Sequence, residues 1–241
     1  MAMRTQCAYY SRVAQIPMLK TAPASHFRQQ SGTLPRLSAA GRLRVTQLWY
    51  IRLLLDAGAD PNATSNISEH LGSLATACFT HLQCTEILVT LLEAGADINA
   101  SNLVVNALQV AACFNTAAVD TLLQWGADVN VPGSNRTRKW LSNIPRYVNY
   151  KNREDVSFGV KRLFGEEGNF GTALQIASVV GHVDAMRLLI AEGADVNAPG
   201  VFTALGVALV AGQKEVVQVL EQAGARITEM EARKVKGCML N

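Results

Sequence analysis

The best candidate for chemistry in this 241-residue sequence is a small set of thiol and imidazole groups. Cys78, His81 and Cys84 are spaced three residues apart, and Cys113 could supply a fourth ligand. Thiolate and imidazole are the ligands of structural zinc sites. Cysteine is also among the residues most often buried as a small apolar filler. We favour the filler role for these cysteines, and we therefore predict no bound metal.

Motifs that usually carry catalysis or cofactor binding are missing from the sequence. It has no Gly-x4-Gly-Lys-Ser/Thr phosphate loop, no Gly-x-Gly-x-x-Gly fingerprint, no His-Glu-x-x-His pair and no Gly-x-Ser-x-Gly elbow. No paired acid and base or activated nucleophile takes their place. We predict that the chain is not an enzyme and binds no cofactor.

The formal net charge of +3 is an average over unlike segments. Residues 1–55 hold eight Lys/Arg and no acid, whereas residues 56–131 hold eight acids and no Lys/Arg. The five cysteines are too few and unpaired in spacing for a disulfide framework, which favours a reducing compartment. No run of 18 apolar residues occurs, so we expect a soluble protein without a membrane span.

One phrase recurs along the chain: glycine, alanine, aspartate, a variable residue and asparagine. It stands at 58–62, 95–99, 126–130 and 193–197, with a decayed copy at 224–227. Each copy follows an apolar ridge, which predicts a helix that ends at the glycine, because glycine takes the left-handed conformation without a Cβ clash. The third and fourth copies are too far apart for one unit, which predicts an insertion of about 36 residues.

A shorter apolar segment precedes the ridges and carries a helix-start signal. Thr172 and Gln175 have the spacing of a capping box, and Asn106 and Gln109 repeat it. A glycine such as Gly181 separates the short segment from the ridge, as in a tight turn between two helices. We expect the aspartate of each phrase to accept hydrogen bonds from hairpin amides.

These phrases and helix signals resemble ankyrin repeats, over roughly 50–131 and 169–230. The resemblance implies an all-α repeat fold, an α-solenoid of about four to five helix-turn-helix units with short hairpin turns. The sequence Thr-Ala-Leu-Gln at 172–175 resembles the corresponding sequence in the ankyrin arrays of filamentous fungi. Gln109, Gln175 and Gly206 stand where ankyrin repeats usually have a linking histidine, so we predict a weaker network between repeats.

Five segments follow from the repeat pattern and the charge. Residues 1–45 are a basic, acid-free N-terminal segment, 46–131 are repeats with a partial first one, 132–168 are a basic and aromatic insertion, 169–230 are repeats, and 231–241 are a C-terminal cap and tail. We expect the first segment to be a disordered tail or a wrongly joined exon, with a mitochondrial presequence as the alternative. The insertion is a surface loop or a decayed repeat.

An ankyrin stack presents variable residues to a protein partner, so the resemblance implies a protein-binding module. The candidate residues lie at hairpin tips, at one helix end and in the insertion: Asn102, Trp125, Arg138, Lys139, Trp140, Tyr147 and Phe202. The tip residues could equally be plain turns. Nucleic acid is a less favoured partner for the insertion than protein. We expect a monomer that binds one or more proteins.

The function predicted from the resemblance is that of a non-catalytic adaptor or regulatory protein. The fungal likeness adds a co-regulator tied to secondary metabolism. The alternative is an accessory or truncated array of a larger signalling or enzyme-associated chain. We expect the protein in the cytoplasm, the nucleus or both, with the mitochondrion as the second choice.

Overall fold

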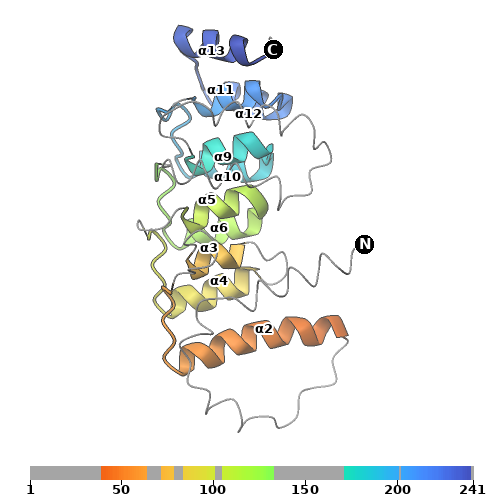
Figure 1. Cartoon of the computed structure of the whole chain (residues 1–241), viewed down its shortest axis with the longest axis vertical. Coiled ribbons are helices and arrows are strands. Elements are labelled where there is room, and N and C mark those ends of the chain that lie inside the picture. The colour runs from red at the N-terminus through yellow and green to blue at the C-terminus, as the bar shows by residue number, and fades with distance from the viewer. Residues whose placement is uncertain are drawn as a thin grey trace.

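The structure is a computed structural model, and it describes residues 39–63, 72–78, 84–100, 105–132, 171–200 and 202–239. Within these ranges ten helices follow one another along the long axis of the molecule, from α2 at one end to α13 at the other (Figure 1). They are α2 (Ala39–Asp56), α3 (Ser73–Cys78), α4 (Cys84–Glu93), α5 (Ala107–Phe114), α6 (Thr116–Gln124), α9 (Ala173–Val180), α10 (Val183–Ala191), α11 (Ala204–Val210), α12 (Lys214–Gln222) and α13 (Glu229–Met239). The predicted all-α repeat stack is confirmed.

The helices pack in two rows. The first row is α3, α5, α9, α11 and α13, each in contact with the next, and the second row is α2, α4, α6, α10 and α12. Cross-contacts join α3 to α4, α5 to α6, α9 to α10 and α11 to α12. The described residues therefore hold four complete helix-turn-helix pairs, with α2 and α13 adding one helix each at the two ends.

Helix α2 is the second-row helix of the first, partial unit. It begins at Ala39, inside the segment 1–45 that the charge pattern separates from the repeats. Residues 1–38 lie outside the described ranges, and the prediction of a tail or a presequence falls on these residues.

The first-row helices α3, α5, α9 and α11 are built mainly from small apolar residues, and most of their residues are buried. Seven of the eight residues of α5 and seven of the eight of α9 are buried. Alanine has the highest helix propensity and leaves room for close approach, so short helices of this composition can pack against neighbours on several sides. Buried residues from both sides of the insertion belong to one hydrophobic core.

A glycine ends each second-row helix in the left-handed conformation. Gly58, Gly95, Gly126, Gly193 and Gly224 have φ between 82° and 88°. Around Gly126, the glycine N–H donates to the Leu123 carbonyl and the Ala127 N–H donates to the Leu122 carbonyl, both at 3.0 Å. These two bonds satisfy carbonyls that the helix leaves open. The predicted helix ends at the repeated glycines are confirmed.

Two buried glutamines link α5 and α9 to the segment that begins the next first-row helix. Gln175 completes the predicted capping box with Thr172, and its Nε2 donates to the Phe202 carbonyl at 3.0 Å. Gln109 does the same with Asn106, and its Nε2 donates to the Gly171 carbonyl at 2.8 Å. The prediction of a weaker network is wrong at these positions, because an amide side chain has both an acceptor and a donor and can cap one helix while bonding to the next.

The stack is continuous across the segment 133–170, which lies outside the described residues. Helix α5 packs on α9 and α6 packs on α10. His182, at the start of α10, adds two bonds: Nδ1 lies 3.1 Å from the Ala112 carbonyl and Nε2 lies 2.8 Å from Thr116 Oγ1. A carbonyl can only accept, so Nδ1 carries a proton, and a neutral ring then accepts the Thr116 hydroxyl at Nε2.

The last first-row helix, α13, supplies a carboxylate where the stack would need another glutamine. Gly206 stands at the position of Gln175 and has no side chain, and a Cβ there would overlap the Glu231 carboxylate. Glu231 Oε1 instead accepts the Thr203 N–H at 2.6 Å and the Thr203 hydroxyl at 2.9 Å. The start of α11 is thus capped from α13, and this bond pattern explains why residue 206 is glycine.

Replacing Glu231 tests this cap. Glu231→Ala leaves the Thr203 amide without its acceptor, and we expect it to lower the free energy of unfolding by about 1–3 kcal/mol. Glu231→Gln keeps an acceptor oxygen and should lose less. Glu229→Ala, in the same first turn of α13, is the matched control, because both changes remove a negative charge from the helix start. Equal losses for Glu231→Ala and Glu229→Ala in urea titrations followed by circular dichroism would contradict the cap.

Deleting the insertion tests the continuity of the stack. After removal of 133–168, Thr172 follows Gly126 by ten positions. This is the same offset as that of Thr203 from Gly193. Since α5 already packs on α9, we expect the shortened chain to fold with one cooperative thermal transition. A matched 36-residue deletion of 173–208, which removes α9, α10 and most of α11, should abolish cooperative folding. Loss of the cooperative transition in the 133–168 deletion would show that the insertion is needed to join the two parts.

Candidate functional site

The repeated phrases form hairpins that project from the ends of the second-row helices. Within each hairpin the aspartate turns back onto the asparagine two residues later, and Oδ1 accepts its backbone N–H. The distance is 2.8–3.0 Å in four copies, Asp60–Asn62, Asp97–Asn99, Asp128–Asn130 and Asp195–Asn197. The predicted bonding of the aspartates to hairpin amides is confirmed, and it fixes the shape of each hairpin locally.

The asparagine side chain reaches in the other direction, to the next hairpin. Asn130 Oδ1 accepts the Asp195 N–H at 2.8 Å, and Asn130 Nδ2 donates to the Gly193 carbonyl at 3.2 Å. The asparagines of the other three hairpins make the same pair of bonds to the hairpin that follows. Five hairpins are thereby held in register as one edge of the molecule, which we call the hairpin edge.

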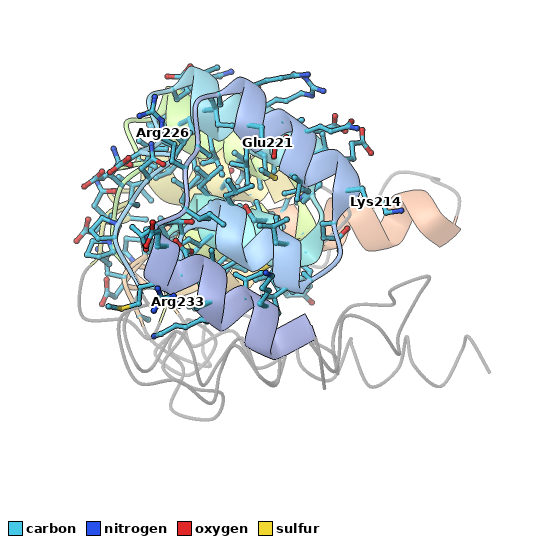
Figure 2. All side chains as sticks on the ribbon, turned by 90° about the horizontal axis from the view of Figure 1, so that it is seen from above. Lys214, Glu221, Arg226 and Arg233 are labelled. Carbon is cyan, nitrogen blue, oxygen red and sulfur yellow. The ribbon has the colours of Figure 1, made fainter. Side chains whose placement is uncertain are left out.

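The hairpin edge ends at Arg226. Its backbone N–H donates to Asn197 Oδ1 at 2.8 Å, so the bond does not depend on the side chain, and an arginine can replace the usual aspartate. Seen along the stack, Arg226 and Lys214 lie on opposite sides, at the two ends of α12 (Figure 2). The charge of the hairpin edge therefore changes sign at its last hairpin.

The rest of the hairpin edge is acidic. The side chains of Asp60, Asp97, Asp128 and Asp195 are exposed. Within the described ranges none of these carboxylates is paired with a lysine or arginine, and residues 56–131 contain no such residue at all. Like charges at a repeated spacing produce a negative potential along the edge, which attracts cationic groups and repels anionic ones.

Trp125 is the one predicted partner-binding residue whose side chain the structure describes as exposed. It is the C-cap residue of α6, directly before Gly126, and 44% of its side chain is accessible. The partial exposure expected from its position is confirmed. A half-exposed indole is a large apolar surface with a polar N–H, which suits the centre of a protein interface.

Phe202 is different, and the expectation that it is presented at a hairpin tip is corrected. Its side chain is 1% exposed and belongs to the core. It lies directly before the Thr203 N-cap of α11, the position from which an apolar residue packs back onto the first turns of a helix. Val105, in the same place before α5, is also 1% exposed. The remaining candidates, Asn102, Arg138, Lys139, Trp140 and Tyr147, lie outside the described residues.

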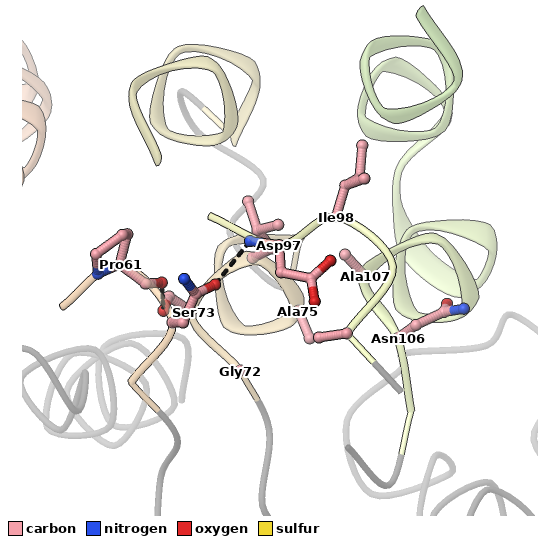
Figure 3. A pocket seen from close by; sticks show the side chains of 11 residues that line it. Pro61, Gly72, Ser73, Ala75, Asp97, Ile98, Asn106 and Ala107 are labelled. Carbon is pink, nitrogen blue, oxygen red and sulfur yellow. Dashed lines mark hydrogen bonds between the residues drawn. The ribbon is translucent and has the colours of Figure 1, made fainter. Parts of the chain in front are cut away.

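A cavity of about 180 Å³ lies between the first two hairpins and the starts of α3 and α5 (Figure 3). The first hairpin contributes Pro61 and Asn62, and the second contributes Asp97, Ile98 and Ala100. The helix starts contribute Gly72, Ser73, Leu74, Ala75, Asn106 and Ala107. No spacing in the sequence indicates this cavity, because its walls come from two different units.

The described cysteines act as buried filler. The Cys78 thiol lies 3.6 Å from the Ala107 carbonyl, and the Cys113 thiol lies 3.6 Å from the Gln109 carbonyl. Burial raises the pKa of the Cys113 thiol well above its ordinary value, because a thiolate would lose its hydration. His81 and the side chain of Cys84 lie outside the described residues, and among those described no three potential ligands gather to hold a metal ion.

Two residues with a structural role escaped sequence reasoning. His182 follows the predicted turn at Gly181, and Glu231 opens the predicted C-terminal cap, but no motif indicates a contact for either side chain. The signal for Glu231 was Gly206, a glycine in place of the repeated glutamine, but its partner lies 25 residues further along the chain. Among the helices described, none is both long and apolar enough to cross a membrane.

Comparison with known proteins agrees with this geometry. Residues 151–231, which include α9 to α12 and the start of α13, match the family model described as ankyrin repeats in three copies. No curated protein matches the sequence. The helix pairs α3–α4 and α5–α6 repeat the arrangement of the matched part, with the same hairpins and the same asparagine bonds. The chain contains ankyrin repeats.

Proposed function

We propose that the chain is a non-catalytic adaptor or regulatory protein that binds a protein partner through the hairpin edge and the adjoining end of α6. Ankyrin repeats are protein–protein interaction modules, and the proposal narrows that general role. The observation that carries the proposal is that some polar groups of the hairpins bond within the stack while others remain at the surface. The asparagines and one oxygen of each aspartate bond to backbone, and the second carboxylate oxygens and Trp125 remain at the surface.

This arrangement of bonded and exposed groups suits the recognition of a protein partner. Because the hairpins are already held by internal bonds, a partner does not have to order them, and less conformational entropy is lost on binding. Trp125 lies three residues before Asp128, so one repeat offers a large apolar group and a carboxylate together. We place this role in the cytoplasm or nucleus, with a monomeric chain. The narrower role of a co-regulator in fungal secondary metabolism rests on the similarity of residues 172–175 to the ankyrin arrays of filamentous fungi.

Proximity labelling with the full-length chain in its native cells tests the proposal, with Trp125→Ala as the key variant. We expect Trp125→Ala to reduce labelling of the main partner about tenfold or more, as truncation of an aromatic interface anchor does. Trp49→Ala is the matched control, because Trp49 is 41% exposed but lies on α2. It should leave labelling unchanged.

Two results would contradict the proposal. One is the absence of any protein labelled above a control with scrambled repeats. The other is a partner whose labelling falls equally with Trp49→Ala and Trp125→Ala. Circular dichroism of each variant checks that the stack is intact, since a folding defect would lower both signals through loss of the whole protein.

A further inference from the structure

The described residues that line the cavity between the first two hairpins combine apolar walls with a single charged group. Pro61, Leu74, Ile98 and several alanines form these walls, and Asp97 is the only titratable side chain among the described lining residues. Figure 3 shows the Asp97 carboxylate among these residues. A volume of about 180 Å³ is small beside the pockets of cofactors and drug-sized ligands, which run to several hundred Å³. It suits one side chain of a partner.

The polar atoms of the cavity are mostly in use. Ser73 Oγ donates to the Pro61 carbonyl, and the Asn62 amide is shared between the Gly95 carbonyl and the Asp97 N–H. At the start of α5 the exposed amides are covered by the capping box that begins at Asn106.

Asp97 is the exception among these groups. Its Oδ1 accepts the Asn99 N–H at 3.0 Å, and its second oxygen has no partner among the described residues. The second carboxylate oxygen of Asp97 is therefore a negatively charged hydrogen-bond acceptor that a ligand in the cavity can use.

The surroundings reinforce this charge. Asp60 stands on the neighbouring hairpin, and the nearest lysine or arginine in the sequence on either side is Arg52 or Arg136. A carboxylate or phosphate entering the cavity would meet uncompensated negative charge, whereas a cation would be attracted. Lysine and arginine also carry an apolar stem that can cover apolar walls while the charged head reaches a polar group.

We propose that the cavity receives a lysine or arginine side chain of the protein partner, with its stem against Pro61 and Ile98 and its cationic head on the free oxygen of Asp97. This inference rests on the proposed function, since it names the chemistry of the partner. It adds a specific anchor at the first two hairpins, separate from Trp125. The partner is thus a protein that presents at least one exposed basic residue to the hairpin edge.

A defined peptide pair provides the test. The probes are two fluorescein-labelled nonapeptides made of three Gly-Ser-Arg units or three Gly-Ser-citrulline units. Citrulline has the shape of arginine without its charge. Binding to the full chain is measured by fluorescence anisotropy at low and at high salt. We expect the arginine peptide to bind more tightly than the citrulline peptide, and to weaken as salt rises.

Two pairs of matched variants locate the site. Asp97→Asn keeps the oxygen that holds the Asn99 N–H but removes the charge, and we expect it to weaken the arginine peptide about fivefold. Asp195→Asn makes the same change outside the cavity and should change binding less than about twofold. Ala100→Leu fills the cavity from the second hairpin and should also weaken binding, whereas Ala198→Leu, at the same hairpin position elsewhere, should not.

The outcomes separate this inference from the proposed function. It is overturned if the arginine peptide shows no binding at about 1 mM, a level that still detects very weak contacts. Equal binding of the two peptides, or equal effects of Asp97→Asn and Asp195→Asn, would overturn it as well. A partner whose labelling falls with Trp125→Ala but not with Asp97→Asn would leave the proposed function standing and remove the cavity as an anchor.

Discussion

No repeat of this stack satisfies its backbone groups by itself, and the rest of the structure depends on that constraint. Each described hairpin after the first receives bonds from an asparagine of the preceding hairpin, and each complete capping box contains a glutamine whose amide is also bonded to the next unit. The glutamine bonds are buried, and a buried donor or acceptor left without a partner costs about 1–3 kcal/mol, so an isolated unit would lose this stabilisation. The small residues of the first row allow neighbours to come close enough for these bonds.

The same constraint explains the two places where the repeat pattern changes. At the last described hairpin, Arg226 and Thr228 stand in place of the aspartate and asparagine, and no further hairpin follows among the described residues to accept asparagine bonds. At the last complete pair the glutamine is replaced by Gly206, and Glu231 of the final helix fills its place. Loss of repeat residues at these positions reflects the geometry of an end. The proposed partner-binding groups are ones that the stack does not use for its own bonds, such as the Trp125 side chain and the second carboxylate oxygen of Asp97.

The framework was predictable from the sequence because it depends on short-range spacing. The left-handed glycines, the capping boxes at Asn106 and Thr172, and the bonds of the repeated aspartates all involve residues within a few positions of one another. Phe202 was misplaced because a phenylalanine after Pro199 and Gly200 resembles a turn, although its place directly before an N-cap puts it in the core. The linking role of the glutamines was missed because a comparison with histidine counts residue types, whereas an amide, like a neutral imidazole, has both a donor and an acceptor. The cap by Glu231 and the cavity at Asp97 depend on contacts between units, which single-sequence spacing does not contain.

The described residues on both sides of 133–170 form one continuous stack. Native-state hydrogen exchange under increasing denaturant tests it most directly, with the slowest amides of α5 compared with those of α9. If α5 and α9 share a core and the Gln109 and His182 bonds, their amides open with the same free energy and the same denaturant dependence. Two distinct opening free energies, with 39–132 and 171–239 unfolding separately, would contradict the account.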